Sequence, residues 1–137
     1  MCGRFFLLRS EADFARLFRL GVSPDFVSRY NIAPTQTVLA VGPDRDGRPA
    51  VATFRWGMVP RWAADAKRAP INARVETVAD KPTFAEAFRK RRCLIPASGF
   101  YEWKREGKAK RPYAVRLADG RPFAFAGLWE SLSLIHI

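Results

Sequence analysis

The stretch "RRCLIPASGFYEWK" (Arg91–Lys104) decides the fold class, because it opens a part of the chain that is predicted to be almost entirely β-structure. Apolar and aromatic residues there predict two strands, Cys93–Ile95 and Gly99–Trp103. Two further strands are expected at Tyr113–Leu117 and Phe123–Leu128. The connecting stretches "KREGKAKR" and "ADGRP" have the composition of turns.

Two helices are predicted further upstream. Ser10–Asp13 reads as a capping box, and apolar residues at helical spacing follow it up to Gly21, a plausible stop. Thr83–Glu86 reads as a second capping box, which starts a helix that runs to about Arg91. Basic residues at the end of this second helix complement the helix dipole.

The remaining upstream segments are short strands and loops. Arg4–Leu8 is a strand candidate, and Val38–Val41 with Ala50–Phe54 reads as a hairpin around a polar turn. The stretch "RYNIAPTQ" (Arg29–Gln36) and the proline-rich segment Gly57–Asn72 are expected to be loops. The pattern therefore predicts an α+β fold, a mostly antiparallel β-sheet or open barrel with a few flanking helices.

The composition narrows the class of protein. With 137 residues, 48% of them apolar, the chain is expected to be one compact domain or part of one. No apolar run approaches a membrane span of about 20 residues, and no signal segment is recognised, so a cytoplasmic protein is expected. Two cysteines lack the spacing of metal ligands, and the chain has one histidine. We therefore expect no metal and no cofactor.

The charge balance points to a polyanionic partner. Lysine and arginine number 24 against 13 acidic residues, which gives a formal charge of +11 and a pI near 10.6. Nucleic acid is favoured over a membrane, because no basic amphipathic helix of useful length is present. The alternative is a solvated basic surface that only aids solubility.

The opening residues "MCGRF" place a cysteine directly after the initiator methionine. Once Met1 is removed, Cys2 carries a thiol and a primary α-amine on adjacent carbons. An α-amine has an intrinsic pKa of about 7.7–8.0, against about 10.4 for lysine, so it is a nucleophile near neutral pH. Such an aminothiol can condense with an aldehyde to a thiazolidine, or its thiol can attack an acyl carbon. An inert, buried cysteine is the structural alternative.

Two further stretches carry polar candidates. In "PINARVET" (Pro70–Thr77), Asn72 offers donors and an acceptor, and Arg74 suits bidentate phosphate contact. In "ASGFYEWK", Glu102 stands between two aromatic residues that can desolvate it and suit it to acid–base work. The first stretch could instead be a loop with an Asx turn, and the glutamate an ordinary strand-surface residue.

The stretch "WGMVPRW" adds aromatic surface beside basic residues. Trp56 and Trp62 in this stretch could stack on unpaired bases, although at least one of them is expected in the core. The basic runs Arg89–Arg92 and Lys104–Arg111 could follow a phosphate backbone or be solvated charge. Cys93 reads as a small buried hydrophobic residue.

Taken together, these stretches resemble the SRAP family, the SOS response-associated peptidase proteins whose bacterial and animal members attach covalently to abasic sites in DNA. The resemblance runs from Met1 to about Glu130, and residues 1–130 are expected to form an SRAP domain. The matching stretches, in the family's order, are "MCGRF", "RYNIAPTQ", "WGMVPRW", "PINARVET", "RRCLIPASGFYEWK" and "PYAVRLADGRPFAFAGLWE".

The resemblance implies roles for seven residues. Cys2 would form a thiazolidine with the aldehyde of an abasic site, Asn72 would orient its amine or the sugar, and Glu102 would shuttle protons. DNA contacts are implied for Arg4 and Arg74 on the phosphates and, by position in the aromatic loop, for Trp56 and Trp62. The implied partner is single-stranded DNA with abasic sites, bound by a monomer that is nucleoid-associated when on DNA.

One departure from the family and three alternatives remain. Family members continue beyond "GLWE" to a His-Asp-Arg-Met-Pro motif, whereas this chain ends in "SLSLIHI", so no role is assigned to His136 and residues 131–137 are expected to be a truncated or non-native tail. The alternatives are a cysteine peptidase that removes its own initiator methionine and a noncatalytic single-strand-binding module. More remote is a glutamine amidotransferase with an N-terminal cysteine.

Overall fold

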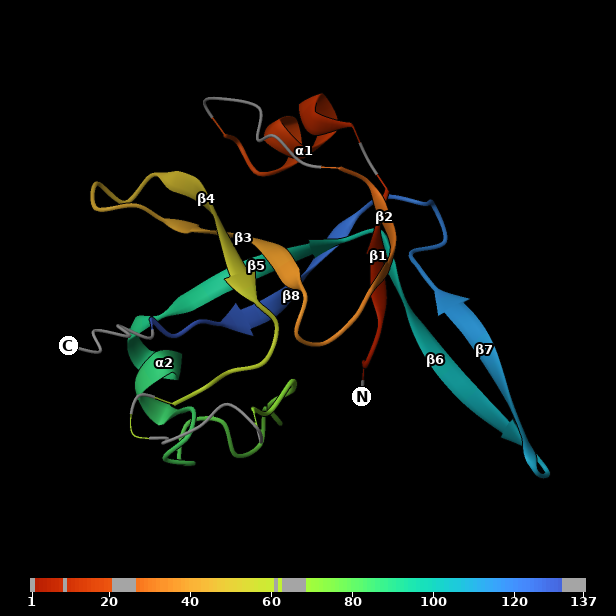
Figure 1. Cartoon of the computed structure of the whole chain (residues 1–137). Helices are drawn as coiled ribbons and strands as arrows, with labels where there is room; N and C mark the ends of the chain where they lie inside the picture. Colours follow the sequence, from red (N-terminus) through yellow and green to blue (C-terminus); the bar gives the residue numbers. More distant parts are fainter. Residues whose placement is uncertain (1, 9, 21–26, 61, 63–68, 132–137) are drawn as a thin grey trace.

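The computed structural model describes residues 2–8, 10–20, 27–60, 62 and 69–131. These residues form two four-stranded antiparallel sheets with two short helices beside them (Figure 1). The α+β prediction is confirmed, and the β-structure is divided between two open sheets. In chain order the elements are β1 (Phe5–Leu7), α1 (Glu11–Leu17), β2 (Arg29–Ile32), β3 (Thr37–Pro43), β4 (Pro49–Arg55), α2 (Ala85–Lys90), β5 (Arg92–Ala97), β6 (Gly99–Glu106), β7 (Ala109–Val115) and β8 (Phe123–Leu128).

The first sheet has the strand order β2-β1-β6-β7, and the second has the order β4-β3-β5-β8. The chain passes from one sheet to the other between β5 and β6, at Ser98. Gly99 is required just after this crossing, since a methyl group there would lie 2.3 Å from Cζ of Phe6 and 2.6 Å from the carbonyl oxygen of Val115. Strands that bend from one sheet into another form such corners in packed β-structures.

The core lies between the two sheets. The ring of Phe125 on β8 lies 5.8 Å from Phe5 on β1 and 6.0 Å from Phe100 on β6, in edge-to-face contacts that aromatic pairs prefer. These contacts fix which faces of β1 and β6 point inward. The buried cluster consists of Phe5, Leu7, Phe14, Ile32, Val38, Val41 and Ala97.

Of the two predicted capping boxes, the first has its N-cap bond. The hydroxyl of Ser10 accepts a hydrogen bond from the backbone N–H of Asp13 at 3.1 Å, and α1 follows directly. The second is wrong, because α2 begins at Ala85 after Phe84, with no side-chain cap. A preceding turn already satisfies the first amide, since the N–H of Ala85 donates to the carbonyl of Lys81. Gly21, the predicted stop of the first helix, lies outside the described residues.

The predicted β3–β4 hairpin is confirmed, whereas two predicted loops are partly strand. Arg29–Ile32 pairs with β1, although it carries no apolar alternation. The basic stretch predicted to connect β6 and β7 is itself paired, with Lys104 opposite Arg111 and Glu106 opposite Ala109. Only a short turn at Gly107, which has a positive φ of 64°, remains between these strands. Figure 1 shows the resulting long hairpin extending away from the rest of the molecule.

Among the described residues, no helix is both long and apolar enough to cross a membrane.

Candidate functional site

Cys2 lies three residues before the start of β1, with its side chain half-buried against the core cluster. Its thiol donates a hydrogen bond of 3.3 Å to the carbonyl oxygen of Arg4. The same carbonyl accepts a bond of 2.9 Å from the N–H of Tyr101 on β6. Pairing with β6 therefore fixes the backbone that carries Cys2.

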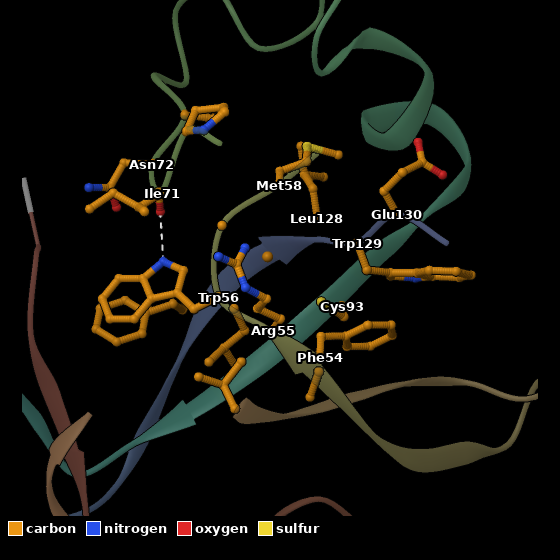
Figure 2. Close-up of a pocket in the computed structure, with 18 of the residues that line it drawn as sticks. Phe54, Arg55, Trp56, Met58, Ile71, Asn72, Cys93, Leu128, Trp129 and Glu130 are labelled. Carbon is orange, nitrogen blue, oxygen red and sulfur yellow. Dashed lines mark hydrogen bonds between the residues drawn. The ribbon is translucent and has the colours of Figure 1, made fainter. Parts of the chain in front are cut away.

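Asn72 approaches Cys2 from a segment distant in sequence. Its side-chain amide donates a hydrogen bond of 2.8 Å to the carbonyl oxygen of Cys2. The residue before it, Ile71, accepts a bond of 2.9 Å from the indole N–H of Trp56, shown by the dashed line in Figure 2. The ring of Trp56 in turn packs edge-to-face on Phe5, with centroids 5.4 Å apart. Trp56 thus acts as a support that holds Asn72 near the start of β1.

Glu102 lies on β6, two residues after Phe100. Because side chains alternate along a strand, Glu102 shares the inward face of Phe100. Its charge is close enough to Cys2 to affect the thiol. Burial raises the pKa of the Cys2 thiol from its ordinary value of 9.0; the backbone of Arg4 opposes this shift, and the charge of Glu102 adds to it. Burial of Cys2 therefore favours the protonated form of its thiol.

Arg4 is exposed, and its guanidinium donates a hydrogen bond of 2.9 Å from Nη1 to Oδ1 of Asn31 on β2. A second tie to β2 runs from the Tyr101 hydroxyl to the carbonyl oxygen of Tyr30, at 2.8 Å. Asn31 orients Arg4, and sequence reasoning assigned it no role. The only available signal was its position inside the "RYNIAPTQ" stretch.

The remaining two predicted residues lie apart from this cluster. Arg74 is exposed, two residues beyond Asn72, and Trp62 has 71% of its surface exposed. No described contact joins either side chain to Cys2, Asn72 or Glu102. Residues 61 and 63–68, which flank Trp62, lie outside the described part of the chain. The structure thus groups Cys2, Asn72, Glu102 and the supporting Trp56, and it leaves Arg74 and Trp62 as separate exposed groups.

An apolar cavity of about 600 Å³ opens beside Cys2 and Asn72. Trp129 stacks on Phe54 at one side of it, with centroids 5.5 Å apart, and Trp56 lies at the other side (Figure 2). Cys93 lines the cavity between them and is buried as predicted, and this burial raises the pKa of its thiol to about 11. Sequence reasoning missed the cavity, because its walls come from separate segments spread along the chain from Cys2 to Glu130.

The described ranges contain no group of three or more His, Cys, Asp or Glu side chains that could hold a metal ion. What the cluster offers is the thiol of Cys2, the Asn72 amide bonded to the backbone of Cys2, and the carboxylate of Glu102 nearby. These are groups for nucleophilic and acid–base chemistry.

Comparison with known proteins places the chain in a family. A family model described as SOS response associated peptidase (SRAP) matches residues 1–134. The chain is 40% identical to the abasic site processing protein YoaM of Bacillus subtilis, over 97% of this chain and 61% of the relative. It is 34% identical to the abasic site processing protein YedK of Escherichia coli, over 93% of this chain and 59% of the relative.

Solved structures have the same fold. A phage-related protein of Bordetella bronchiseptica superposes with a TM-score of 0.76 at 31% identity, over 93% of this chain and 60% of that protein. A protein from Bacteroides thetaiotaomicron gives 0.78 at 26% identity, over 93% and 59%. The chain spans less than two thirds of the length of these relatives and structures.

Proposed function

This chain belongs to the SRAP family, and from this premise we propose that it captures abasic sites in single-stranded DNA as a covalent thiazolidine on Cys2. The hydrogen bond from Asn72 to the Cys2 carbonyl is the observation that carries the proposal. It holds in place the one residue that presents both an amine and a thiol after Met1 is removed. Relatives named abasic site processing proteins support the choice of substrate.

The proposed reaction needs no oxidant or reductant. The Cys2 amine attacks the aldehyde carbon of the ring-opened sugar, the new hydroxyl leaves as water, and an imine forms. The sulfur then adds to the same carbon while the thiol proton moves to the nitrogen, which closes the five-membered ring. One water is released overall. Glu102, whose charge acts on the Cys2 thiol, takes a proton from the amine and donates it to the departing hydroxyl.

The raised pKa of the thiol favours this order of steps. A protonated thiol is a poor first nucleophile, whereas an α-amine with an ordinary pKa is partly unprotonated near neutral pH. A cysteine peptidase instead needs the thiolate, which burial of Cys2 and the charge of Glu102 both disfavour. The amine-first reaction is therefore preferred over the peptidase alternative.

The proposed DNA-contacting residues are chosen by the exposure and charge of their side chains. Arg4, fixed by Asn31, and the exposed Arg74 are the proposed phosphate ligands. Trp62 is exposed and suited to stacking on a base, whereas Trp56 supports Asn72. The net charge of +11 brings the polyanion to this surface.

The test uses the chain with Met1 removed and an oligonucleotide that carries one abasic site. Wild type is expected to give a slower band on a denaturing gel, with an intact mass equal to protein plus DNA less one water. Cys2→Ala should give no adduct, and Cys93→Ala, the matched control for loss of a thiol, should give the full yield. An adduct from Cys2→Ala would overturn the proposed chemistry. Absence of any adduct with affinity retained would leave a noncatalytic single-strand-binding module.

A further inference from the structure

The β6–β7 hairpin begins in the site and ends far from it. Its residues from Trp103 to the turn and along β7 are exposed, and among the described strands β7 lies at the edge of its sheet, paired with β6 alone (Figure 1). From Trp103 to the turn, side chains on both faces of the hairpin are therefore accessible to a ligand.

The two faces of the hairpin carry different side chains, and only one of them includes Glu102. Side chains two apart on a strand share a face, so one face runs from Glu102 to Lys104 on β6 and from Tyr113 to Arg111 on β7. In register, Glu102 lies opposite Tyr113 and Lys104 lies opposite Arg111. The other face carries a second basic pair, Arg105 opposite Lys110. Only the first face, which we call the Glu102 face, continues from the carboxylate beside Cys2.

The Glu102 face holds like charges side by side. Like charges directly opposite on neighbouring strands are destabilising, and Lys104 and Arg111 share one carboxylate, that of Glu106, with a nitrogen–oxygen distance of 3.7 Å for each. Both side chains are about two-thirds exposed. Exposed pairs of this length are weak, so a phosphate can replace the carboxylate at either cation.

An aromatic ring lies beside Glu102, one row along the hairpin from this basic pair. Tyr113 is directly opposite Glu102 and 43% exposed. It lines a shallow hollow together with Glu102, Trp103, Lys104 and Val115. Two residues of strand span about 7 Å, so Glu102 and Tyr113 form one row of the face, and Lys104 and Arg111 form the next row. A ring that can stack on a base therefore lies one row from two cations that can contact phosphate.

We propose that the Glu102 face is a binding track for the DNA strand that flanks the reacting nucleotide. Tyr113 stacks on the adjacent base, and Lys104 and Arg111 contact the following phosphates. This inference rests on the proposed function for its ligand, a single DNA strand, and it assigns that strand a path across the hairpin. The basic pair on the opposite face protects the sheet edge in the ordinary way.

The experiment compares two double variants that remove equal charge from the same hairpin. Binding of an undamaged, fluorescein-labelled single strand is followed by anisotropy over a series of salt concentrations. Lys104→Gln/Arg111→Gln is expected to reduce the slope of log K against log salt by about 1.4, since each phosphate contact contributes roughly 0.7 on a single strand. Arg105→Gln/Lys110→Gln is expected to retain the wild-type slope. Equal slopes for the two variants would overturn the proposal.

A second variant tests the stacking separately from the charge. Tyr113→Ala should weaken binding by about tenfold with the salt slope unchanged, and wild-type affinity for this variant would count against the track. Circular dichroism and melting temperature verify that each variant is folded. Adduct formation with an abasic strand is measured in parallel. If wild type forms the adduct but the two double variants have the same salt slope, the binding track is refuted and the proposed function stands. If the two slopes differ but wild type forms no adduct, the proposed thiazolidine chemistry is refuted and the binding track stands.

Discussion

The side-chain amide of Asn72 donates a hydrogen bond of 2.8 Å to the main-chain carbonyl of Cys2, across seventy residues of sequence. This bond links the residue that carries the proposed chemistry to the loop that Trp56 also holds through Ile71. The proposed reaction needs such a restraint, because a misplacement of about 1 Å at a reacting group can slow a reaction by about 100-fold.

Asn72→Ala should therefore slow adduct formation by about 10- to 100-fold while Cys2 stays chemically intact. Asn72→Asp should be slow as well, because an ionised carboxylate cannot donate to a carbonyl. Rates come from time courses on denaturing gels at saturating abasic DNA. A wild-type rate for Asn72→Asp would mean that the donated bond is not what matters.

Glu102→Gln should lower the rate of adduct formation by about 100-fold or more, because the amide cannot exchange protons. The same change should lower the pKa of the Cys2 thiol, since the negative charge of Glu102 contributes to raising it. Alkylation of Cys2 against pH, in a Cys93→Ala background, measures this shift. A profile displaced to higher pH would contradict the assigned electrostatic contact.

The two tryptophans should respond differently to mutation. Trp56→Phe keeps the ring against Phe5 but loses the indole donor to Ile71, so it should cost about 1 kcal/mol of stability and slow the reaction. Trp62→Ala should leave the unfolding free energy unchanged and weaken single-strand binding by about tenfold. Denaturant unfolding and anisotropy separate the two effects. Loss of stability in the Trp62 variant would place that ring in the core.

A buried ion pair should make Arg91 critical for stability. Its guanidinium lies 2.8 Å from a carboxylate oxygen of Glu130, and both side chains are almost fully buried. Arg91→Ala should destabilise the fold by about 3–5 kcal/mol, because it removes one partner of an ion pair that is almost fully buried. The double variant Arg91→Met/Glu130→Leu should recover much of that loss in urea unfolding. A double variant no more stable than Arg91→Ala would exclude this explanation.

Alkaline pH should destabilise the fold through Cys93. Burial raises the pKa of this thiol to about 11 from an ordinary value of 9.0, so the unfolded chain loses the proton first as pH rises. The contribution is fully present below pH 9 and is lost as pH rises towards 11, with a slope of at most about 1.4 kcal/mol per pH unit. Cys93→Ala should show a correspondingly shallower fall of unfolding free energy over this interval. Parallel curves would contradict the buried-thiol assignment.

The sequence by itself determined the features that rest on neighbouring residues. Ser10 caps α1 because its hydroxyl reaches an amide only three residues away. The β3–β4 hairpin and strands β5 and β8 follow from apolar runs bounded by turn residues. The candidate residues were also named from sequence, through motifs that resemble one family. Their side-chain chemistry indicated what they could do, not where they would meet.

Only the tertiary structure decided the features that depend on distant partners. Arg29–Ile32 is a strand because β1 supplies its hydrogen bonds, and α2 begins after Phe84 without a side-chain cap, following a turn in which the N–H of Ala85 donates to the carbonyl of Lys81. The Asn72–Cys2 bond, the cavity between Trp56 and Trp129, and the path of the β6–β7 hairpin away from the core all arise from packing of separate segments. Local propensity contains no information on such contacts, because their energies exist only when the sheets have already come together.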